Sequence, residues 1–126
     1  MSTIKVGTIL AADGSTTTQP SIPALDQRMA KVWVNFDQTG TLAIRASFGV
    51  SSMTDNGSGD VTVNFTAAFA DINYAPVCLF NGADGGNVTA PYYNGAPSTS
   101  SYRIGSRRTD NSGALDSQYA NIVFFR

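Results

Sequence analysis

Apolar and polar residues alternate with a period of two between Ala30 and Phe65, and this alternation limits the possible folds more than any other feature of the chain. Such a period places successive apolar side chains on one face of a β-strand. The runs are Lys31–Phe36, then Leu42, Ile44 and Ala46, and finally Val61, Val63 and Phe65. Asp37–Gly40 and Thr54–Gly59 separate them and are rich in turn residues. The stretch therefore predicts a meander of three antiparallel strands.

The first of these runs carries large side chains on both faces. Val32, Val34 and Phe36 share one face, and Trp33 belongs to the other. The first face is suited to building a core within the chain. We predict that the face of Trp33 packs against a neighbouring copy of the chain.

Composition favours strands over helices along the rest of the chain. Glu is absent, only two Lys are present, and charged residues make up 13 % of the 126 residues. Ser, Thr, Asn and Gly are abundant, and they favour strands and turns. We expect an all-β chain, folded as an antiparallel β-sandwich of jelly-roll-like type. Its later strands are predicted at Pro76–Asn81, Tyr102–Ser106 and Gln118–Phe125, the last of them integral to a sheet.

The first 29 residues differ in character from the rest. Ala12–Pro20 is a polar run with little to bury, which is typical of a linker or an extended arm. We expect residues 1–29 to form an N-terminal arm and linker, and residues 30–126 to form the β domain.

Ser21–Met29 is the one helix candidate in this arm, with Ile22, Leu25 and Met29 on one face. A helix of two turns is not stable alone in water. Two hypotheses stay open. Either three copies of this apolar stripe meet around an axis, or the stripe folds back onto its own domain.

The residue types that most catalytic mechanisms need are missing. Histidine is absent, which removes the usual general base and the commonest transition-metal ligand. All nine acidic residues are Asp, mostly in turn-like segments where Asp bonds its own backbone. Asp55–Asp60 is similar to a calcium loop, but it lacks the downstream Glu, and a hairpin turn explains it better. We expect no enzymatic activity, no metal and no cofactor.

Charge and hydropathy narrow the range of partners. A net charge of −1 provides no basic stripe for nucleic acid. No segment approaches the ~18 apolar residues that cross a bilayer, and the N-terminus lacks the apolar region of a signal peptide. The one cysteine, Cys78, lies in an apolar segment and is expected to be a core thiol. We therefore expect a soluble protein made in the cytoplasm, without nucleic-acid binding or membrane insertion.

Aromatic, amide and charged residues gather in the segments 81–97 and 107–113, which we expect to be loops. Aromatic faces beside amides and carboxylates suit sugar rings and their hydroxyl groups, and an arginine pair suits anionic groups of a bacterial polysaccharide. The alternative stays open that the tyrosines plug a sheet edge or a subunit contact, and that the arginines are solvated or bound to Asp110. The candidate binding residues are Asp84, Asn87, Tyr92, Tyr93, Asn94, Arg107 and Arg108.

The stretch that opened this section resembles the distal domain of fibre and virion structural proteins of tailed bacteriophages. The similarity is almost continuous from Ala30 to Phe65, and its combination of Trp, Asn and turn residues is not required by strand alternation. Gly49 and Met53 depart from the pattern, where Asn and Ile are expected. The matching residues are Ala30–Phe36, Gly40, Ile44–Phe48, Val50–Ser52, Thr54–Gly57 and Gly59–Phe65, with weaker similarity at Ser2–Ile9 and Asn121–Phe125.

The resemblance implies a homotrimeric fibre of the virion, made in the host cytoplasm. Residues 1–29 would attach to a tail or baseplate protein, and the C-terminal domain would face the host and recognise a surface polysaccharide or lipopolysaccharide. The candidate trimer contacts are Ile22, Leu25, Met29 and Trp33. Two other functions stay open: a purely structural virion or baseplate component without a receptor role, and a carbohydrate-binding module.

Overall fold

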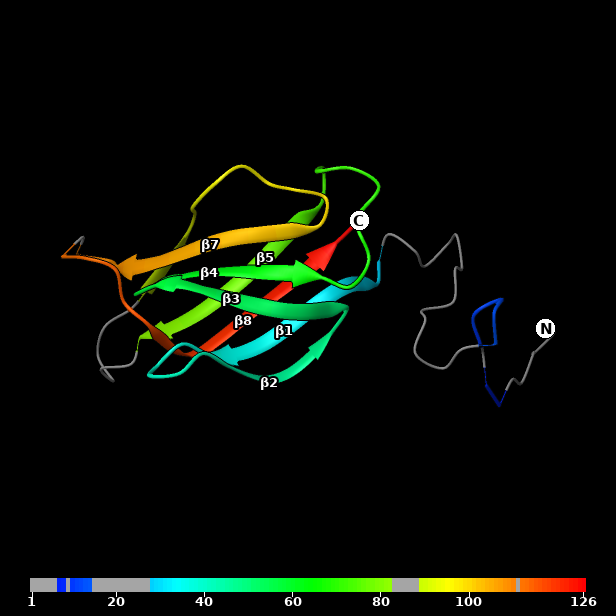
Figure 1. Cartoon of the computed structure of the whole chain (residues 1–126), viewed down its shortest axis with the longest axis horizontal. Helices are drawn as coiled ribbons and strands as arrows, with labels where there is room; N and C mark the ends of the chain where they lie inside the picture. Colours follow the sequence, from blue (N-terminus) through cyan, green and yellow to red (C-terminus); the bar gives the residue numbers. More distant parts are fainter. Residues whose placement is uncertain (1–6, 9, 15–27, 83–88, 111) are drawn as a thin grey trace, which may run out of the picture.

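The alternating residues build two antiparallel sheets of four strands each, which pack as a β-sandwich in the computed structural model of the chain (Figure 1). The structure describes residues 7–8, 10–14, 28–82, 89–110 and 112–126. In these ranges there is no helix, and so none able to cross a membrane. The strands are β1 (Ala30–Asp37), β2 (Ala43–Phe48), β3 (Val50–Gly57), β4 (Asp60–Phe65), β5 (Ala75–Gly82), β6 (Thr89–Tyr93), β7 (Ser101–Arg108) and β8 (Ser117–Phe125). The predicted all-β sandwich is confirmed.

The sheets differ in which strands they contain. Sheet A has the order β2-β1-β8-β5, and sheet B has the order β3-β4-β7-β6. The hairpins β1–β2, β3–β4 and β6–β7 stay within a sheet, and the other connections cross between sheets. β8 pairs with both β1 and β5, so the predicted C-terminal strand is indeed integral to its sheet.

The predicted three-stranded meander is wrong. Four strands form between Ala30 and Phe65, and β2 and β3 belong to different sheets. Thr54–Gly59 was expected to be a turn, but β3 continues to Gly57 and pairs with β4, so the turn is much shorter. Alternation fixes which side chains share a face. It does not say which sheet a strand joins.

Gly49 marks the point where the chain passes from sheet A to sheet B. Its φ of 71° lies in the left-handed region, and a Cβ there would come 3.0 Å from the Lys31 carbonyl oxygen. Asn, expected here from the phage fibre pattern, also adopts this conformation more readily than most residues. The departure from the pattern is therefore compatible with the same backbone path.

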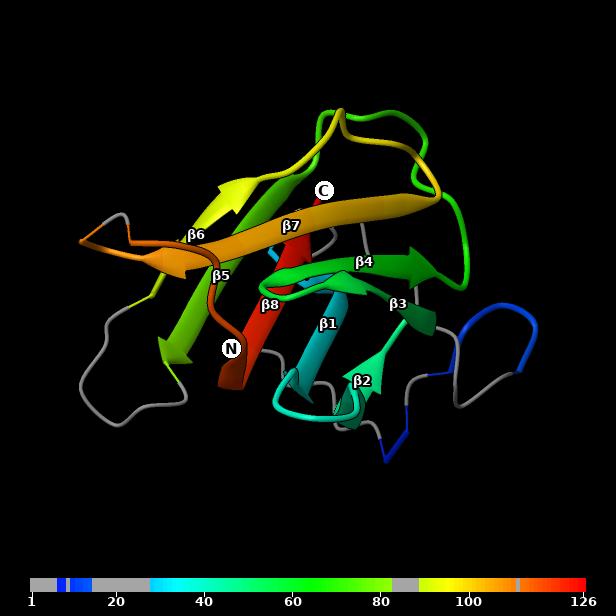
Figure 2. The ribbon, with the colours of Figure 1, turned by 60° about the vertical axis from the view of Figure 1, so that its left-hand side comes forward.

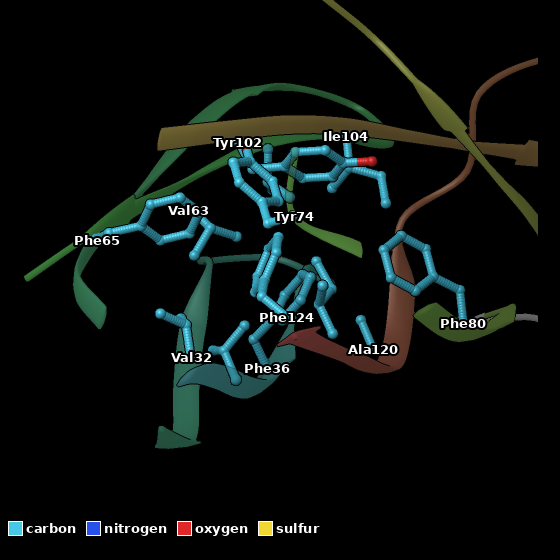
Figure 3. Close-up of a cluster of buried hydrophobic side chains, with 13 residues drawn as sticks. Val32, Phe36, Val63, Phe65, Tyr74, Phe80, Tyr102, Ile104, Ala120 and Phe124 are labelled. Carbon is cyan, nitrogen blue, oxygen red and sulfur yellow. The ribbon is translucent and has the colours of Figure 1, made fainter. Parts of the chain in front are cut away.

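The inward faces of both sheets meet in an aromatic-rich core (Figure 3). Val32, Val34 and Phe36 of β1 point into it and are buried, as their alternation predicted. The Phe124 ring lies 5.0 Å from the Phe65 centroid. Edge-to-face pairs of this kind add packing energy beyond burial alone. The full cluster is Val32, Val34, Phe36, Val61, Val63, Phe65, Tyr74, Phe80, Tyr102, Ile104, Ala120, Ile122 and Phe124.

The sandwich has two distinct ends. β1 begins at the end where β8 finishes, on the right of Figure 1, and this is where the N-terminal segment joins the domain. The turns after β1, β3 and β7 lie at the opposite end, which we call the far end. Chain entry and the far-end turns are thus separated by the length of the strands.

The far end is held together around Gly59. Its carbonyl oxygen accepts a hydrogen bond from the Ser106 amide at 2.7 Å, and its amide donates to the Asp116 carboxylate at 2.6 Å. The Ser106 hydroxyl donates to the Leu115 carbonyl oxygen at 2.7 Å. The turn between β3 and β4 is therefore fixed to the segment that joins β7 to β8.

Some segments expected to be loops are strands. Thr89–Tyr93 forms β6, and Arg107 and Arg108 complete β7. β6 contains Pro91, which cannot donate a backbone hydrogen bond, and β6 lies at the edge of sheet B, where a proline is tolerated.

Most of the predicted helix Ser21–Met29 lies outside the described residues, and with it Ile22 and Leu25. Arg28 and Met29, its last two residues, form a turn and a bend before β1. Met29 is exposed.

Candidate binding face

The outer face of sheet B is almost entirely polar. Along β4, Val61 and Val63 point inward, so Asp60, Thr62 and Asn64 point outward. Thr62 lies opposite Thr54 on β3 and Arg103 on β7, so all three strands contribute to the same surface. We call this surface the polar face. It consists of Ser52, Thr54, Asn56, Asp60, Thr62, Asn64, Tyr92, Asn94, Arg103 and Arg107.

Asp60 is the hub of the polar face. Its carboxylate accepts hydrogen bonds from Arg103 Nε at 3.0 Å and Nη2 at 2.6 Å, in a two-pronged ion pair. Asn94 Nδ2 donates to the same carboxylate at 2.6 Å. The hydrogen bond from Arg103 is the main cause that holds the pKa of Asp60 below its ordinary value. These bonds fix three side chains from separate strands and loops in one arrangement.

Amide and hydroxyl groups extend this network toward β3. Asn64 Nδ2 donates to Ser52 Oγ at 3.0 Å and to Thr54 Oγ1 at 3.1 Å. Asn56 Nδ2 donates to Thr62 Oγ1 at 2.9 Å. The result is a rigid surface of alternating donors and acceptors.

Tyr92 supplies an aromatic ring at the β6 side of the polar face. It lies opposite Gly105 on β7, and a Cβ on Gly105 would come within 2.6 Å of Tyr92 Cε1. The ring therefore occupies the space that a side chain at Gly105 would fill. The Arg107 guanidinium lies 5.0 Å from the ring centroid, a cation–π contact.

The structure brings together some of the predicted binding residues but not all of them. Tyr92, Asn94 and Arg107 share the polar face. Tyr93 points to the other side of β6, where its ring packs against Tyr102 at 5.3 Å. Arg108 ends β7 next to Arg107 and, by strand alternation, belongs to the opposite face. Asp84 and Asn87 lie outside the described residues.

Sequence reasoning missed most of the polar face, including Asp60, Arg103 and Asn56. A usable signal was present, since Asp60, Thr62 and Asn64 occupy every outward position of β4. The same alternation that places Val61 and Val63 in the core places these three polar residues on the opposite face. The partnership of Asp60 with Arg103 spans 43 positions and follows only from strand pairing.

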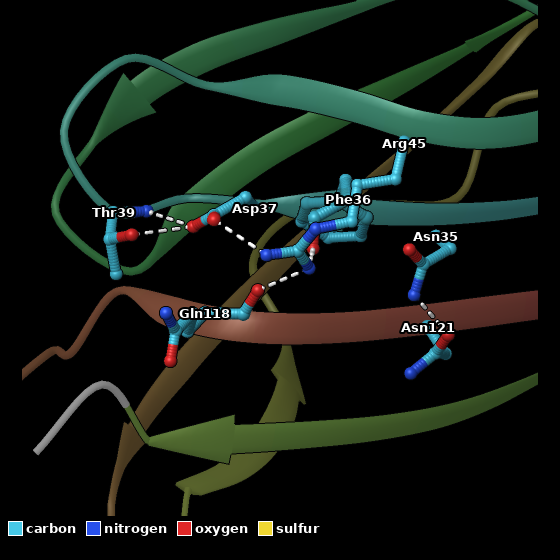
Figure 4. Close-up of polar contacts among 7 residues, drawn as sticks. All are labelled: Asn35, Phe36, Asp37, Thr39, Arg45, Gln118 and Asn121. Carbon is cyan, nitrogen blue, oxygen red and sulfur yellow. Dashed lines mark hydrogen bonds and ion pairs between the residues drawn. The ribbon is translucent and has the colours of Figure 1, made fainter. Parts of the chain in front are cut away.

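Sheet A also carries an arginine over a tyrosine, but in a different setting. The Arg45 guanidinium lies 4.5 Å from the Tyr119 centroid. Arg45 donates to the Phe36 and Gln118 carbonyl oxygens and pairs with Asp37 (Figure 4). These partners engage Arg45 within the domain, so it is poorly placed to bind a ligand.

The rest of the outer face of sheet A holds apolar side chains beside the pair Asn35 and Asn121, in which Asn35 Nδ2 donates to Asn121 Oδ1 at 2.6 Å (Figure 4). Trp33 lies opposite Phe48 on one side and Val123 on the other, and Val123 lies opposite Val77. Leu79 is 73 % exposed on the same face, and Trp33 is 37 % exposed. The outward position predicted for Trp33 is confirmed. We call Trp33, Phe48, Val77, Leu79 and Val123 the apolar face.

The chemistry of the polar face suits the binding of hydroxyl-bearing ligands. Amides, hydroxyls and one aromatic ring are the groups that sugars accept. The Asp55–Asp60 segment holds the end of β3, the short turn at Ser58 and Gly59, and the start of β4, with the Asp55 carboxylate accepting a hydrogen bond from the Gly57 amide at 2.9 Å. Across the described ranges, no three His, Cys, Asp or Glu residues gather as a metal site.

Replacing Asp60 by Asn is expected to make the free energy of unfolding depend less on pH in the acidic range. The folded-state pKa of Asp60 is lowered, so its carboxylate stabilises the fold above the unfolded pKa of about 3.9. That contribution is lost as the pH falls through the folded pKa. Between about pH 4 and pH 2, the free energy of unfolding should fall less steeply in Asp60→Asn than in the parent. Urea unfolding at each pH measures both slopes, and equal slopes would contradict this assignment.

Comparisons with protein-family models, with curated proteins and with solved structures gave no match.

Proposed function

We propose that this chain is a bacteriophage tail fibre protein that binds a host surface saccharide through the polar face. The observation that supports this most is that the Tyr92–Arg107 pair lies beside the Asp60 network on one exposed sheet face. The resemblance of Ala30–Phe65 to phage fibre proteins supports the setting. Binding without cleavage is the proposed activity.

The two ends of the sandwich support a direction for the fibre. Residues 1–29 are proposed to attach to a tail or baseplate protein, and they enter the domain at the end opposite the far-end turns. Attachment at one end leaves the far end and the long sides of the sandwich available to the host. The polar face occupies one of these sides.

The finer architecture is proposed to be a jelly-roll-like homotrimer. The apolar face would lie between copies, because burying apolar surface contributes about 25 cal/mol per Å². On the same sheet, Asp37 and Arg45 form an ion pair with each other. Light scattering at micromolar concentration tests this, and a monodisperse monomer would contradict it.

A purely structural virion component is the second candidate, and the apolar face favours it. A protein that serves only to assemble needs this surface and no receptor site. The two candidates differ in what they expect of the polar face, which is a binding site in one and plain surface in the other.

Tyr92→Ala separates them. Loss of an aromatic platform is expected to weaken binding to purified bacterial surface polysaccharide about ten-fold, since aromatic contacts contribute about 0.5–1.5 kcal/mol each. Gly105→Ala keeps Tyr92 but displaces its ring, and should weaken binding as well. The measurement is a titration of the labelled protein against polysaccharides from a panel of strains.

Tyr119→Ala is the matched control, because Tyr119 is also an exposed tyrosine beneath an arginine, on the other sheet. It should bind like the parent. If Tyr92→Ala and Gly105→Ala bind as tightly as Tyr119→Ala, the polar face is not the receptor site and the structural role gains support.

A further inference from the structure

A small pocket opens where the edges of the two sheets meet. β5 ends sheet A and β6 ends sheet B, and Figure 2 shows these strands side by side. Between them lies a cavity of about 240 Å³. Its lining includes Pro76, Cys78, Pro91, Tyr93 and Ile104, together with Tyr92 and Tyr102. We call this cavity the edge pocket.

The edge pocket is uncharged at neutral pH. None of its lining residues is acidic or basic. Burial raises the pKa of the Cys78 thiol to about 11, and burial together with a hydrogen bond to Tyr93 raises the pKa of Tyr102. A charged ligand group would lose its hydration here without an opposite charge to replace it. The pocket therefore suits a neutral group with an apolar part.

The lining also offers polar groups at defined places. Pro91 and Pro76 supply apolar ring surface and no backbone N–H. The hydroxyl-bearing residues of the lining include Tyr93, which is 57 % exposed, and Tyr102, which is buried. A mainly apolar pocket with one or two hydrogen-bonding groups is typical of small-molecule sites.

Tyr92 connects the edge pocket to the polar face, because it lines the pocket and also carries the cation–π contact with Arg107. A saccharide on the polar face can therefore place one substituent around the β6 edge. At about 30 Å³ per water molecule, the cavity corresponds to about eight waters, which exceeds what a single hydroxyl fills.

We propose that the edge pocket binds the acetyl group of an acetylated sugar in the receptor. The acetyl methyl packs against Ile104 and the two prolines, and its carbonyl oxygen accepts a hydrogen bond from the Tyr93 hydroxyl. This inference rests on the proposed saccharide binding and specifies its ligand class. Sugars with acetamido or O-acetyl groups share this chemistry.

Nuclear magnetic resonance titration of the full chain tests the pocket directly, with N-acetylglucosamine and glucose as the two probes. We expect N-acetylglucosamine to shift the signals of Cys78, Tyr93 and Ile104, and glucose to bind about ten-fold more weakly, as for a group lost from an apolar pocket. Equal responses to both sugars, or no response at these residues, would overturn the proposal.

Two variants sharpen the test. Cys78→Leu fills the pocket, and Val77→Leu is its matched control, since Val77 belongs to the outer face of the same strand. Of these two variants, Cys78→Leu should lose the preference for the acetylated sugar, and Val77→Leu should keep it. Tyr93→Phe keeps the ring but removes the hydroxyl, and it should reduce the same preference. It provides the test if Cys78→Leu does not fold. A preference kept in both pocket variants would overturn the proposal.

Polysaccharide binding distinguishes this inference from the proposed function. Mild alkali removes O-acetyl groups and leaves N-acetyl groups, which separates the two sources. If binding depends on Tyr92 but not on any acetyl group, the pocket proposal fails and the saccharide proposal stands. If N-acetylglucosamine enters the pocket but no polysaccharide binds, the pocket proposal stands and the receptor function fails.

Discussion

Gly59→Ala is expected to destabilise the protein by about 2–5 kcal/mol, through left-handed backbone strain and steric overlap together. Gly59 has a φ of 62°, and a Cβ there would come 2.8 Å from the Leu115 amide nitrogen. The neighbouring atoms are backbone, held by the hydrogen bonds that join Gly59 to Ser106 and Asp116. They cannot move without opening the far end.

Gly40→Ala is the control for backbone strain alone. Gly40 has a φ of 71°, and a Cβ there would meet nothing within 4 Å. Its cost should be about 1–2 kcal/mol. Urea unfolding of both variants gives the difference, and equal costs would show that the far-end packing around Gly59 does not matter to stability.

Phe124→Ala is the second large effect, with an expected loss of about 3–5 kcal/mol. Phe124 is fully buried on the central strand β8 of sheet A, and its ring contacts Phe65 at 5.0 Å and Tyr102 at 5.3 Å from sheet B (Figure 3). Removing the ring leaves a cavity between the sheets that rigid aromatic neighbours cannot fill.

Tyr119→Ala is the matched control for Phe124→Ala, because Tyr119 is an aromatic residue of the same strand, β8, but is 51 % exposed. Its loss should change the free energy of unfolding by less than about 1 kcal/mol. Thermal or urea unfolding measures both. A loss for Phe124→Ala no greater than that for Tyr119→Ala would contradict the packing described here.

Much of the fold could be predicted because its strands are half-buried. Val32, Val34 and Phe36 alternate cleanly with polar or exposed residues, and the same holds at Val61 and Val63. When one face of a strand is buried, every second residue is apolar, and this alternation is visible in the sequence. The core positions of β1 and β4 and the outward position of Trp33 therefore followed from the residues alone.

Sheet membership and the polar face could not be predicted in the same way. Val50–Gly57 has an exposed face and turn-forming residues, so nothing local identifies it as an edge strand of sheet B. Asn94 and Asp60 are 34 positions apart and meet only because β6, β7 and β4 are neighbours. Contacts of this range depend on topology, which short-range patterns do not contain.

Saccharide binding at the polar face is the central claim, and it is tested most directly by ¹H–¹⁵N spectra of the full chain with and without a bound surface polysaccharide. The account predicts that the largest shift changes fall within Asp60–Asn64, Tyr92–Asn94 and Arg103–Arg107. Changes confined to the apolar face, at Trp33, Phe48, Val77, Leu79 and Val123, would contradict it.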